Sequence, residues 1–339
     1  MKIGLTYDLR SEYLAMGYGE EETAEFDRDD TVVAVEKALT ALGHTIDRIG
    51  NARSLTQRLV AGDRWDLVFN IAEGLYGVGR EAQVPAILDL YQIPYTFSDP
   101  MVLGLTLDKG MTKHVVRDCG FATPDFAVLD DSIDISRVGF DPPYFVKPLA
   151  EGTGKGISAD SIICIKDLLA PACRRLYTRF QQPVLVEQYL SGREFTIGLT
   201  GTGALAKVLG TLEVILLPTA EKGAYSYVNK ERCEELVQYR LVRAEEDQVV
   251  RKAETIALGI YKALGCRDAG RLDMRCDEQG RPFFLEINPL AGIHPEHSDL
   301  PILCNHLHIP YVELIRRIIA SAAERVDTTP FKQIKPSRR

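Results

Sequence analysis

The sequence lacks the features that would direct the protein to a membrane or to nucleic acid. No stretch approaches the roughly 20 apolar residues that a membrane-spanning helix needs. Positive charge is not in excess, since 40 Lys and Arg residues stand against 48 Asp and Glu residues, which gives a net charge of −8. General nucleic-acid binding relies on a basic surface. We therefore expect neither a membrane nor a nucleic acid as a partner.

Paired cysteines are also missing. The seven Cys residues form no CxxC pair and their number is odd, which is typical of free thiols in a reducing compartment. We expect each Cys to pack as a small apolar side chain, and we expect a cytoplasmic protein. The opening segment, MKIGLTYDLR, has too short an apolar run for a secretion signal and is predicted as a first buried strand.

The length of 339 residues allows two or three domains. In the first hundred residues, short apolar segments alternate with segments of helical apolar spacing, which is typical of a doubly wound parallel sheet. Strands are predicted at 2–6, 44–49, 66–71 and 94–96, and helices at 31–42 and 83–90.

A second unit is predicted to begin near Pro100 and a third near Gly192. The second has predicted helices at 108–118 and 166–180 and strands at 143–147, 162–165 and 184–188. The third has predicted strands at 194–200, 206–214, 269–276 and 282–288, helices at 245–264 and 309–323, and a polar loop near 217–240. We therefore predict an N-terminal α/β substrate-side domain (1–100), a central domain (101–190), a C-terminal α+β domain (191–325) and a tail (326–339).

The segment GRLDMRCDEQGRPFFLEINP, residues 270–289, carries the strongest chemical signal. DEQG predicts a turn between two strands, and side chains alternate between the faces of a strand. Arg271 and Asp273 therefore share one face, as do Glu286 and Asn288 on the second strand. Such hard oxygen ligands on rigid strands suit Mg²⁺. The alternative is an amphipathic surface hairpin whose acidic side chains are solvated.

A second signal is KPLAEGTGKGIS, residues 147–158. Lys147 ends an apolar strand, and three glycines follow it. Such a loop lets backbone N–H groups approach phosphate oxygens, while the lysine supplies positive charge. It is not a Walker A loop, because the lysine precedes the glycines and GK[ST] is missing. A glycine-rich hairpin turn is the alternative.

A third signal is VLVEQYLSGREF, residues 184–195. Glu187 lies near the end of a predicted apolar strand, and Glu194 opens the next. A carboxylate at the close of an apolar strand suits a nucleotide amino group or a ribose hydroxyl. Considered singly, either residue is better explained as an ordinary charge at the edge of a sheet.

Together, these segments resemble the ATP-grasp superfamily and, within it, the D-alanine–D-alanine ligases, over residues 2–323. The resemblance implies an ATP-grasp fold preceded by a doubly wound parallel-sheet domain, with ATP between the central and C-terminal domains. It also implies a cytoplasmic, ADP-forming ligase that joins amino-acid-like substrates through an acyl phosphate, as in cell wall biogenesis. ATP and Mg²⁺ (or Mn²⁺) are the cofactors it implies, and a homodimer is expected.

The same resemblance assigns residues to ATP. Lys109, in LTLDKGMTK, would touch the nucleotide, and Lys147 would bind its phosphates. Glu187, Tyr189 and Leu190 would meet adenine, Glu194 would meet the ribose, and Leu285 would pack on the adenine ring. The loop that covers the phosphates would contain Glu151, Gly152, Thr153, Gly154 and Gly156.

GRLD and LEINP match two signatures of the family. Asp273, Glu286 and Asn288 would accordingly bind the metal. Arg271 would act at the transferring phosphate, and Lys230, in SYVNKE, would bind the γ-phosphate. The backbone N–H near Gly292 would stabilise the tetrahedral oxyanion. Residues expected to contact the substrates are Glu25, Thr153, Arg271, Gly292, His294 and Ser298.

The sequence departs from the family on the substrate side. The first loop, TYDLRSEYLAMGYGEEETAEFD, lacks the family's Gly-Gly-Ser, so that either Glu25 or Asp27 would hold the first substrate's amine. Thr153 and the glycine after it replace a typical serine pair. NPLAGIHPEHSD replaces NTxPGFTxxS, with Gly292 well aligned and Ser298 aligned only with an extra residue.

Two further departures bear on specificity. Glu231 follows Lys230 where the family has an aromatic residue, and its charge would favour a substrate with an extra cationic group. His294 and His297, in HPEH, would shape the second-substrate pocket, with a zinc site as the alternative. Three hypotheses remain: a D-alanine–D-alanine ligase, a ligase of the same chemistry on another amino acid or small carboxylate, and an ATP-binding regulatory module without turnover.

Overall fold

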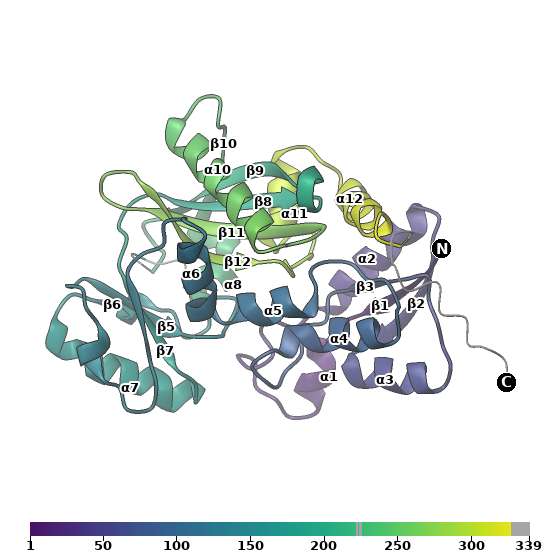
Figure 1. Cartoon of the computed structure of the whole chain (residues 1–339), viewed down its shortest axis with the longest axis horizontal. Coiled ribbons are helices and arrows are strands. Elements are labelled where there is room, and N and C mark those ends of the chain that lie inside the picture. The colour runs from purple at the N-terminus through teal and green to yellow at the C-terminus, as the bar shows by residue number, and fades with distance from the viewer. Residues whose placement is uncertain (222, 224–225, 327–339) are drawn as a thin grey trace.

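The computed structural model describes residues 1–221, 223 and 226–326, which form three sheets with helices packed around them (Figure 1). The strands are β1 (Lys2–Thr6), β2 (Thr45–Gly50), β3 (Leu67–Asn70), β4 (Phe126–Leu129), β5 (Tyr144–Pro148), β6 (Ile162–Ile163), β7 (Val184–Gln188), β8 (Glu194–Thr200), β9 (Lys207–Leu216), β10 (Val237–Val242), β11 (Ala269–Cys276) and β12 (Pro282–Asn288). The helices are α1 (Arg10–Ala15), α2 (Asp29–Ala41), α3 (Ala52–Val60), α4 (Gln83–Leu90), α5 (Pro100–Leu107), α6 (Lys109–Asp118), α7 (Leu169–Phe180), α8 (Tyr227–Glu231), α9 (Cys233–Leu236), α10 (Gln248–Ala263), α11 (Asp299–His306) and α12 (Tyr311–Ala323).

The N-terminal sheet is parallel, with strand order β2-β1-β3. Its strands are short, β1 and β3 are largely apolar, and all four residues of β3 are buried, as expected of a parallel strand covered on both faces. The helix between β2 and β3, α3, begins where the Asn51 side chain accepts hydrogen bonds from two backbone N–H groups. The doubly wound α/β prediction is thus confirmed. The strand predicted at 94–96 forms only a single bridge, between Val68 and Tyr95.

The other two sheets are antiparallel. The central one has the order β4-β7-β5-β6, and α7 packs against it. The C-terminal one has the order β10-β9-β8-β11-β12. Helix α10 packs on this larger sheet, and α5 and α6 contact β12 (Figure 1). The central and C-terminal sheets therefore hold the predicted phosphate loop and the predicted metal hairpin on separate frameworks.

The two ends of the described chain share one hydrophobic core. Helix α12 contacts α2, and the two helices lie side by side in Figure 1. Leu314 and Ile318 of α12 are fully buried in the same cluster as Ile3 of β1 and Val35 of α2. Burial of apolar surface is the main favourable term in folding. This core therefore holds the N-terminal domain against the segment that follows β12.

Three predictions about local structure were wrong. The polar loop near 217–240 contains α8, α9 and β10, and β10 pairs with β9 at the edge of the sheet. The strand predicted at 162–165 ends at Ile163. All seven Cys are free thiols, but Cys119 and Cys164 are exposed and so are not small core side chains.

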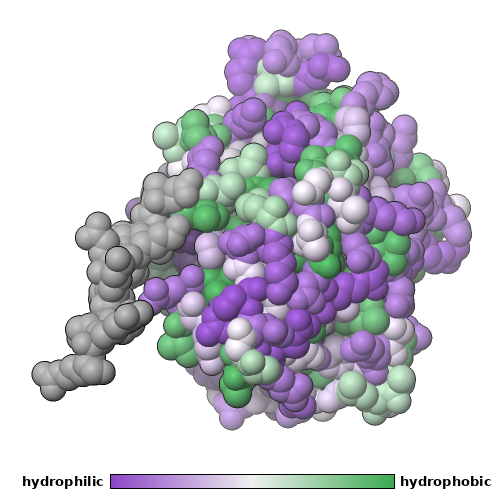
Figure 2. All heavy atoms as spheres, turned by 90° about the vertical axis from the view of Figure 1, so that its right-hand side faces the viewer, coloured by the Kyte–Doolittle hydropathy of each residue, from purple (hydrophilic) through white to green (hydrophobic). Residues whose placement is uncertain are grey.

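The surface carries its apolar residues in a scattered arrangement. On the face shown in Figure 2, the described apolar residues lie between hydrophilic ones rather than in one broad patch. Obligate dimers usually bury a large and more apolar surface. The described part of this face therefore gives no support to the expected homodimer. Across the described ranges, no helix combines the length and apolarity that crossing a membrane requires.

Candidate active site

The β11–β12 hairpin brings the predicted metal ligands together. Arg271 pairs with Asn288, and Asp273 pairs with Glu286, so all four lie on one face as predicted. Asp273 is only 7% exposed, and its Oδ1 accepts a 2.9 Å hydrogen bond from Thr196 Oγ1. The alternative of a solvated surface hairpin is therefore wrong. The turn is closed by a hydrogen bond of 3.0 Å between backbone groups of residues 280 and 277.

The donor set of this face fits a magnesium ion. Two carboxylates and a carboxamide lie on this face, and their oxygen atoms are hard donors of the kind that Mg²⁺ takes. Burial opposes charge on Glu286, but nearby cations, first Lys109 and then Lys147, lower its pKa overall. Glu286 is thus a carboxylate throughout the neutral range. Hard oxygen ligands beside phosphate-binding lysines are typical of Mg²⁺ sites.

Buried lysines surround this hairpin face. Nζ of Lys109 lies 3.7 Å from Oε2 of Glu286, and Nζ of Lys147 lies 2.9 Å from Oε2 of Glu187. Lys113 forms a second ion pair with Glu187. Glu187 is only 2% exposed, so the alternative of an ordinary edge charge is wrong. Its contact with adenine stays a prediction, because its carboxylate now has two lysine partners.

The glycine-rich loop connects β5 to β6, which are antiparallel neighbours, and it reaches the N-terminal domain. The backbone N–H of Gly152 donates a 2.5 Å hydrogen bond to Glu25, and Nζ of Lys155 lies 3.2 Å from the same carboxylate. The loop is therefore more than a hairpin turn. Thr153 has a φ of 49°, a conformation unusual for a residue with a side chain. Its buried Oγ1 has no partner among the described residues.

The other two glycines of the loop have packing roles. Gly154 and Gly156 both have positive φ, which glycine adopts without steric cost. A Cβ on Gly154 would meet the backbone N of Tyr227 at 2.9 Å, and one on Gly156 would meet Pro148 at 2.6 Å. Neither lines the two cavities described next. The loop thus packs closely on α8 and on the end of β5.

The first cavity lies between the central and C-terminal sheets, where the nucleotide is predicted. Arg275 lies 5.1 Å from the Tyr189 ring, and its guanidinium is 3.4 Å from Glu194. Burial raises the pKa of Glu194, an effect that Arg275 opposes. The predicted residues that line this cavity are Lys147, Glu187, Tyr189, Leu190, Glu194, Lys230, Asp273, Leu285 and Glu286.

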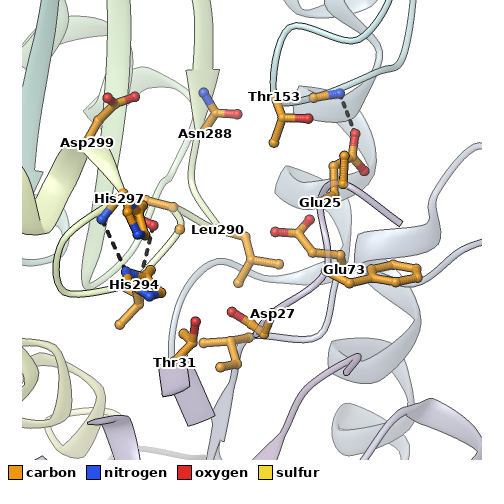
Figure 3. A pocket seen from close by; sticks show the side chains of 18 of the residues that line it. Glu25, Asp27, Thr31, Glu73, Thr153, Asn288, Leu290, His294, His297 and Asp299 are labelled. Atoms are coloured by element: carbon orange, nitrogen blue, oxygen red, sulfur yellow. Dashed lines mark hydrogen bonds between the residues drawn. The ribbon is translucent and has the colours of Figure 1, made fainter. Parts of the chain in front are cut away.

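A second cavity, of about 220 Å³, lies between the N-terminal domain and the segment after β12 (Figure 3). Lys230 lines both cavities, so they meet at the predicted γ-phosphate site. The predicted residues that line the second cavity are Glu25, Asp27, Gly152, Thr153, Arg271, Asn288, Gly292, His294, His297 and Ser298. Most of the residues predicted to bind nucleotide and substrate thus line one of two adjoining cavities, whereas Lys109 and Glu151 line neither.

The HPEH segment contacts other parts of the chain. His294 Nε2 lies 3.3 Å from Asp30 at the start of α2, and His297 Nδ1 lies 3.0 Å from Glu234 of α9. The centroids of the two imidazole rings are 4.5 Å apart. Over the described ranges, no three His, Cys, Asp or Glu side chains are grouped to hold a metal. The segment therefore shapes the cavity, and the zinc alternative finds no third ligand in those ranges.

Comparison with known proteins agrees with this geometry. Residues 119–320 match the family model "D-ala D-ala ligase C-terminus". A curated D-alanine–D-alanine ligase from Bordetella petrii is 34% identical over 300 residues, which are 86% of this chain and 86% of the relative. The chain belongs to the D-alanine–D-alanine ligase family.

Solved structures support the same ATP-grasp fold. A D-alanine–D-alanine ligase from Bacillus anthracis complexed with ATP has a TM-score of 0.69 at 23% identity, covering 97% of this chain and 99% of that one. The VanG D-Ala:D-Ser ligase from Enterococcus faecalis has a TM-score of 0.71 at 19% identity, covering 95% and 99%. At these identities the likeness establishes the fold, and the residue roles rest on the geometry above.

Several charged residues at or beside these cavities had not been predicted from the sequence, among them Arg275 and Glu81. Lys113 follows Lys109 by one helical turn on α6, a spacing that does place two side chains on one face. Arg80, Lys155 and Glu73 had no comparable local signal. The side chain of Glu231, which was expected to add charge here, lies outside what the structure describes.

Proposed function

We propose that this protein is an ATP-dependent carboxylate–amine ligase that joins two amino-acid-like substrates through an acyl phosphate. The observation that carries the proposal is the position of Lys230 on both cavities. A nucleotide in the first cavity would present its γ-phosphate to a carboxylate in the second. Proximity of this kind supplies a large part of the catalytic advantage of an enzyme.

The first step transfers the γ-phosphoryl group. A substrate carboxylate oxygen attacks the γ-phosphorus, the bond to the β-phosphate oxygen breaks, and ADP leaves. Lys147, Lys230 and Arg271 would neutralise charge on the phosphate oxygens, which is the main requirement of phosphoryl transfer. Mg²⁺ or Mn²⁺ held by Asp273, Glu286 and Asn288 would neutralise further charge on those oxygens.

The second step forms the amide. The amine of the second substrate attacks the acyl carbon, and phosphate leaves with the oxygen that came from the carboxylate. The backbone N–H of Gly292 donates to no described acceptor and lies at the cavity wall. It is therefore available for the oxyanion of the tetrahedral intermediate. Glu25, with its partners Arg80 and Lys155, would hold the glycine-rich loop closed over the reactants.

The reaction is proposed to take place in the cytoplasm, because seven free thiols are typical of a protein in a reducing compartment. ATP and small amino-acid-like molecules are the proposed partners, and the homodimer stays a prediction.

The test measures ADP released from ATP, in the presence of Mg²⁺, with a panel of D- and L-amino acids supplied singly and in pairs. ADP release that requires both an amino acid and Mg²⁺ supports the proposal. Normal ATP binding with no amino-acid-dependent release would favour the regulatory module.

A further inference from the structure

The substrate cavity has an acidic wall on its N-terminal side. Glu25, Asp27, Glu73 and Glu81 all line the cavity, and Figure 3 shows the first three on the side opposite Asn288. Arg271 and Lys230 also line it, and Lys230 lines the nucleotide cavity as well. The N-terminal domain therefore contributes four carboxylates to the wall of the substrate cavity.

The carboxylates of this wall differ in their partners. The negative charge of Glu25 is compensated, since its carboxylate contacts Arg80 at 2.9 Å, Lys155 at 3.2 Å and the Gly152 N–H at 2.5 Å. The carboxylates of Asp27 and Glu73 receive no hydrogen bond and no ion pair from any residue that the structure describes.

Two other cations line the cavity without contacting these carboxylates among the described residues. Arg10 pairs with Glu20 at 2.6 Å, and Arg28, an exposed residue, forms no ion pair with Asp27 or Glu73 there. Burial raises the pKa of Asp27, and the neighbouring carboxylate of Asp8 raises it further. Burial likewise raises the pKa of Glu73, and nearby carboxylates, first Glu81, raise it further, although Arg80, which is paired with Glu25, opposes this. Two acidic side chains in this wall thus lack the cation that a buried carboxylate needs in order to ionise at low cost.

A single substrate ammonium group cannot compensate this wall. An α-amino acid with an apolar side chain brings one ammonium, which leaves at least one of Asp27 and Glu73 without a counter-ion. The cavity also has apolar lining, including Leu290, Ile71 and Ile293. A methylene stem that carries a terminal cation would pack on such residues and still present its charge to a carboxylate.

We propose that the first substrate is an α-amino acid with a basic side chain, whose two cationic groups are bound by Asp27 and Glu73. This inference rests on the proposed ligase function and specifies its substrate class. A site built to pair a charged group discriminates strongly against analogues that lack it, because its own buried polar groups are then left unpaired. The basic side chain is thus the feature that distinguishes the preferred substrate from alanine.

The experiment compares isosteric substrates. ADP release is measured with the D- and L-forms of lysine, ornithine, norleucine and alanine, each alone and paired with D-alanine or glycine as amine. We expect kcat/KM for lysine or ornithine to exceed that for norleucine by at least about tenfold, the cost of roughly 1.4 kcal/mol of lost pairing. Of Glu73→Gln and Asp27→Asn, the variant that removes the partner of the side-chain cation should lower the value for the basic substrate by a similar factor and leave that for norleucine within about twofold. The variant that removes the partner of the α-ammonium, which both substrates carry, should lower both values.

Asp27→Asn provides a second variant, and Glu278→Gln, at an exposed position in the β11–β12 turn, is the matched control. The control should keep the wild-type preference. Equal use of norleucine and lysine, or equal losses on both in Glu73→Gln and Asp27→Asn, would overturn the inference. Turnover of alanine with lysine and ornithine inert would overturn it and leave the ligase function standing. No ADP release with any pair, with ATP bound normally in calorimetry, would overturn both.

Discussion

Arg80 donates a 2.9 Å hydrogen bond from Nη2 to Oε2 of Glu25, and its Nη1 donates at 3.0 Å to the backbone carbonyl of Ala150. One guanidinium therefore joins the first loop of the N-terminal domain to the glycine-rich loop of the central domain. Both partners are largely buried, with side-chain exposures of 10% and 8%. This pair fixes the wall of the substrate cavity relative to the phosphate loop.

Removing the Arg80 charge should destabilise the protein. Arg80→Met leaves Glu25 without its first cationic partner, and breaking a buried pair from one side typically costs roughly 3–5 kcal/mol. Urea unfolding followed by circular dichroism measures the change. Arg137→Met is the control, because Arg137 pairs with Asp130 on the surface and such pairs contribute about 0–1 kcal/mol. Equal effects of the two substitutions would show that the Arg80 pair has no special role.

The acidic wall should make stability depend on pH. Burial raises the pKa of Glu81 to about 7, and Glu25 beside it acts in the same direction, although Arg80 opposes both. The folded state then binds more protons than the unfolded state between about pH 4.5 and pH 7, so the contribution of Glu81 to stability is lost as pH rises through this range. Relative to wild type, the free energy of unfolding of Glu81→Gln should therefore increase by on the order of 1–3 kcal/mol between pH 5 and pH 8. A stability difference that is the same at both pH values would refute this.

The metal assignment predicts the effect of neutralising Glu286. Glu286→Gln should lower kcat by on the order of 10²-fold or more, since it removes a ligand and a charge at the transferring phosphate. The fold should remain, as judged by an unchanged circular dichroism spectrum. Glu278→Gln, at the exposed turn of the same hairpin, should keep full activity. Near-normal activity of Glu286→Gln at moderate Mg²⁺ would show that the metal is held elsewhere.

The lysine cluster predicts losses in nucleotide affinity. Lys109→Ala and Lys147→Ala should each weaken ATP binding by roughly 1.5–3 kcal/mol, as expected for a lost hydrogen bond to a charged group. Burial lowers the pKa of Lys113 to about 8, although Glu187 opposes this. Lys113→Met should weaken ATP binding less than the two alanine variants, because Lys113 acts only by positioning Glu187 and Lys147. Calorimetric titration with ATP and Mg²⁺ measures all three. Unchanged affinity in both alanine variants would exclude a phosphate-binding role.

Features set by local patterns were predictable from the sequence. The shared face of Arg271, Asp273, Glu286 and Asn288 follows from strand alternation and a four-residue turn, and the structure has that register. Helix α4 and strands β7, β8, β11 and β12 have the predicted bounds for the same reason. Edge strand β10 was missed because it lies among polar and charged residues and has only β9 as a neighbour.

Contacts between distant segments were not predictable in this way. Arg80 and Lys155 meet at Glu25, and each comes from a different part of the chain. No spacing within one segment indicates such a meeting. The choice between Glu25 and Asp27 was open in the sequence for the same reason. The structure places both at the cavity but gives only Glu25 a full set of partners.

Transfer of oxygen from substrate to phosphate tests the acyl-phosphate route most directly. An amino acid that supports ADP release is labelled with ¹⁸O in its carboxylate and incubated with ATP, Mg²⁺ and the enzyme. Phosphorus NMR of the released phosphate then reports the label. We predict one ¹⁸O atom in each phosphate released with amide product, because the attacking carboxylate oxygen leaves with the phosphorus. Phosphate free of substrate-derived ¹⁸O would contradict the proposed reaction.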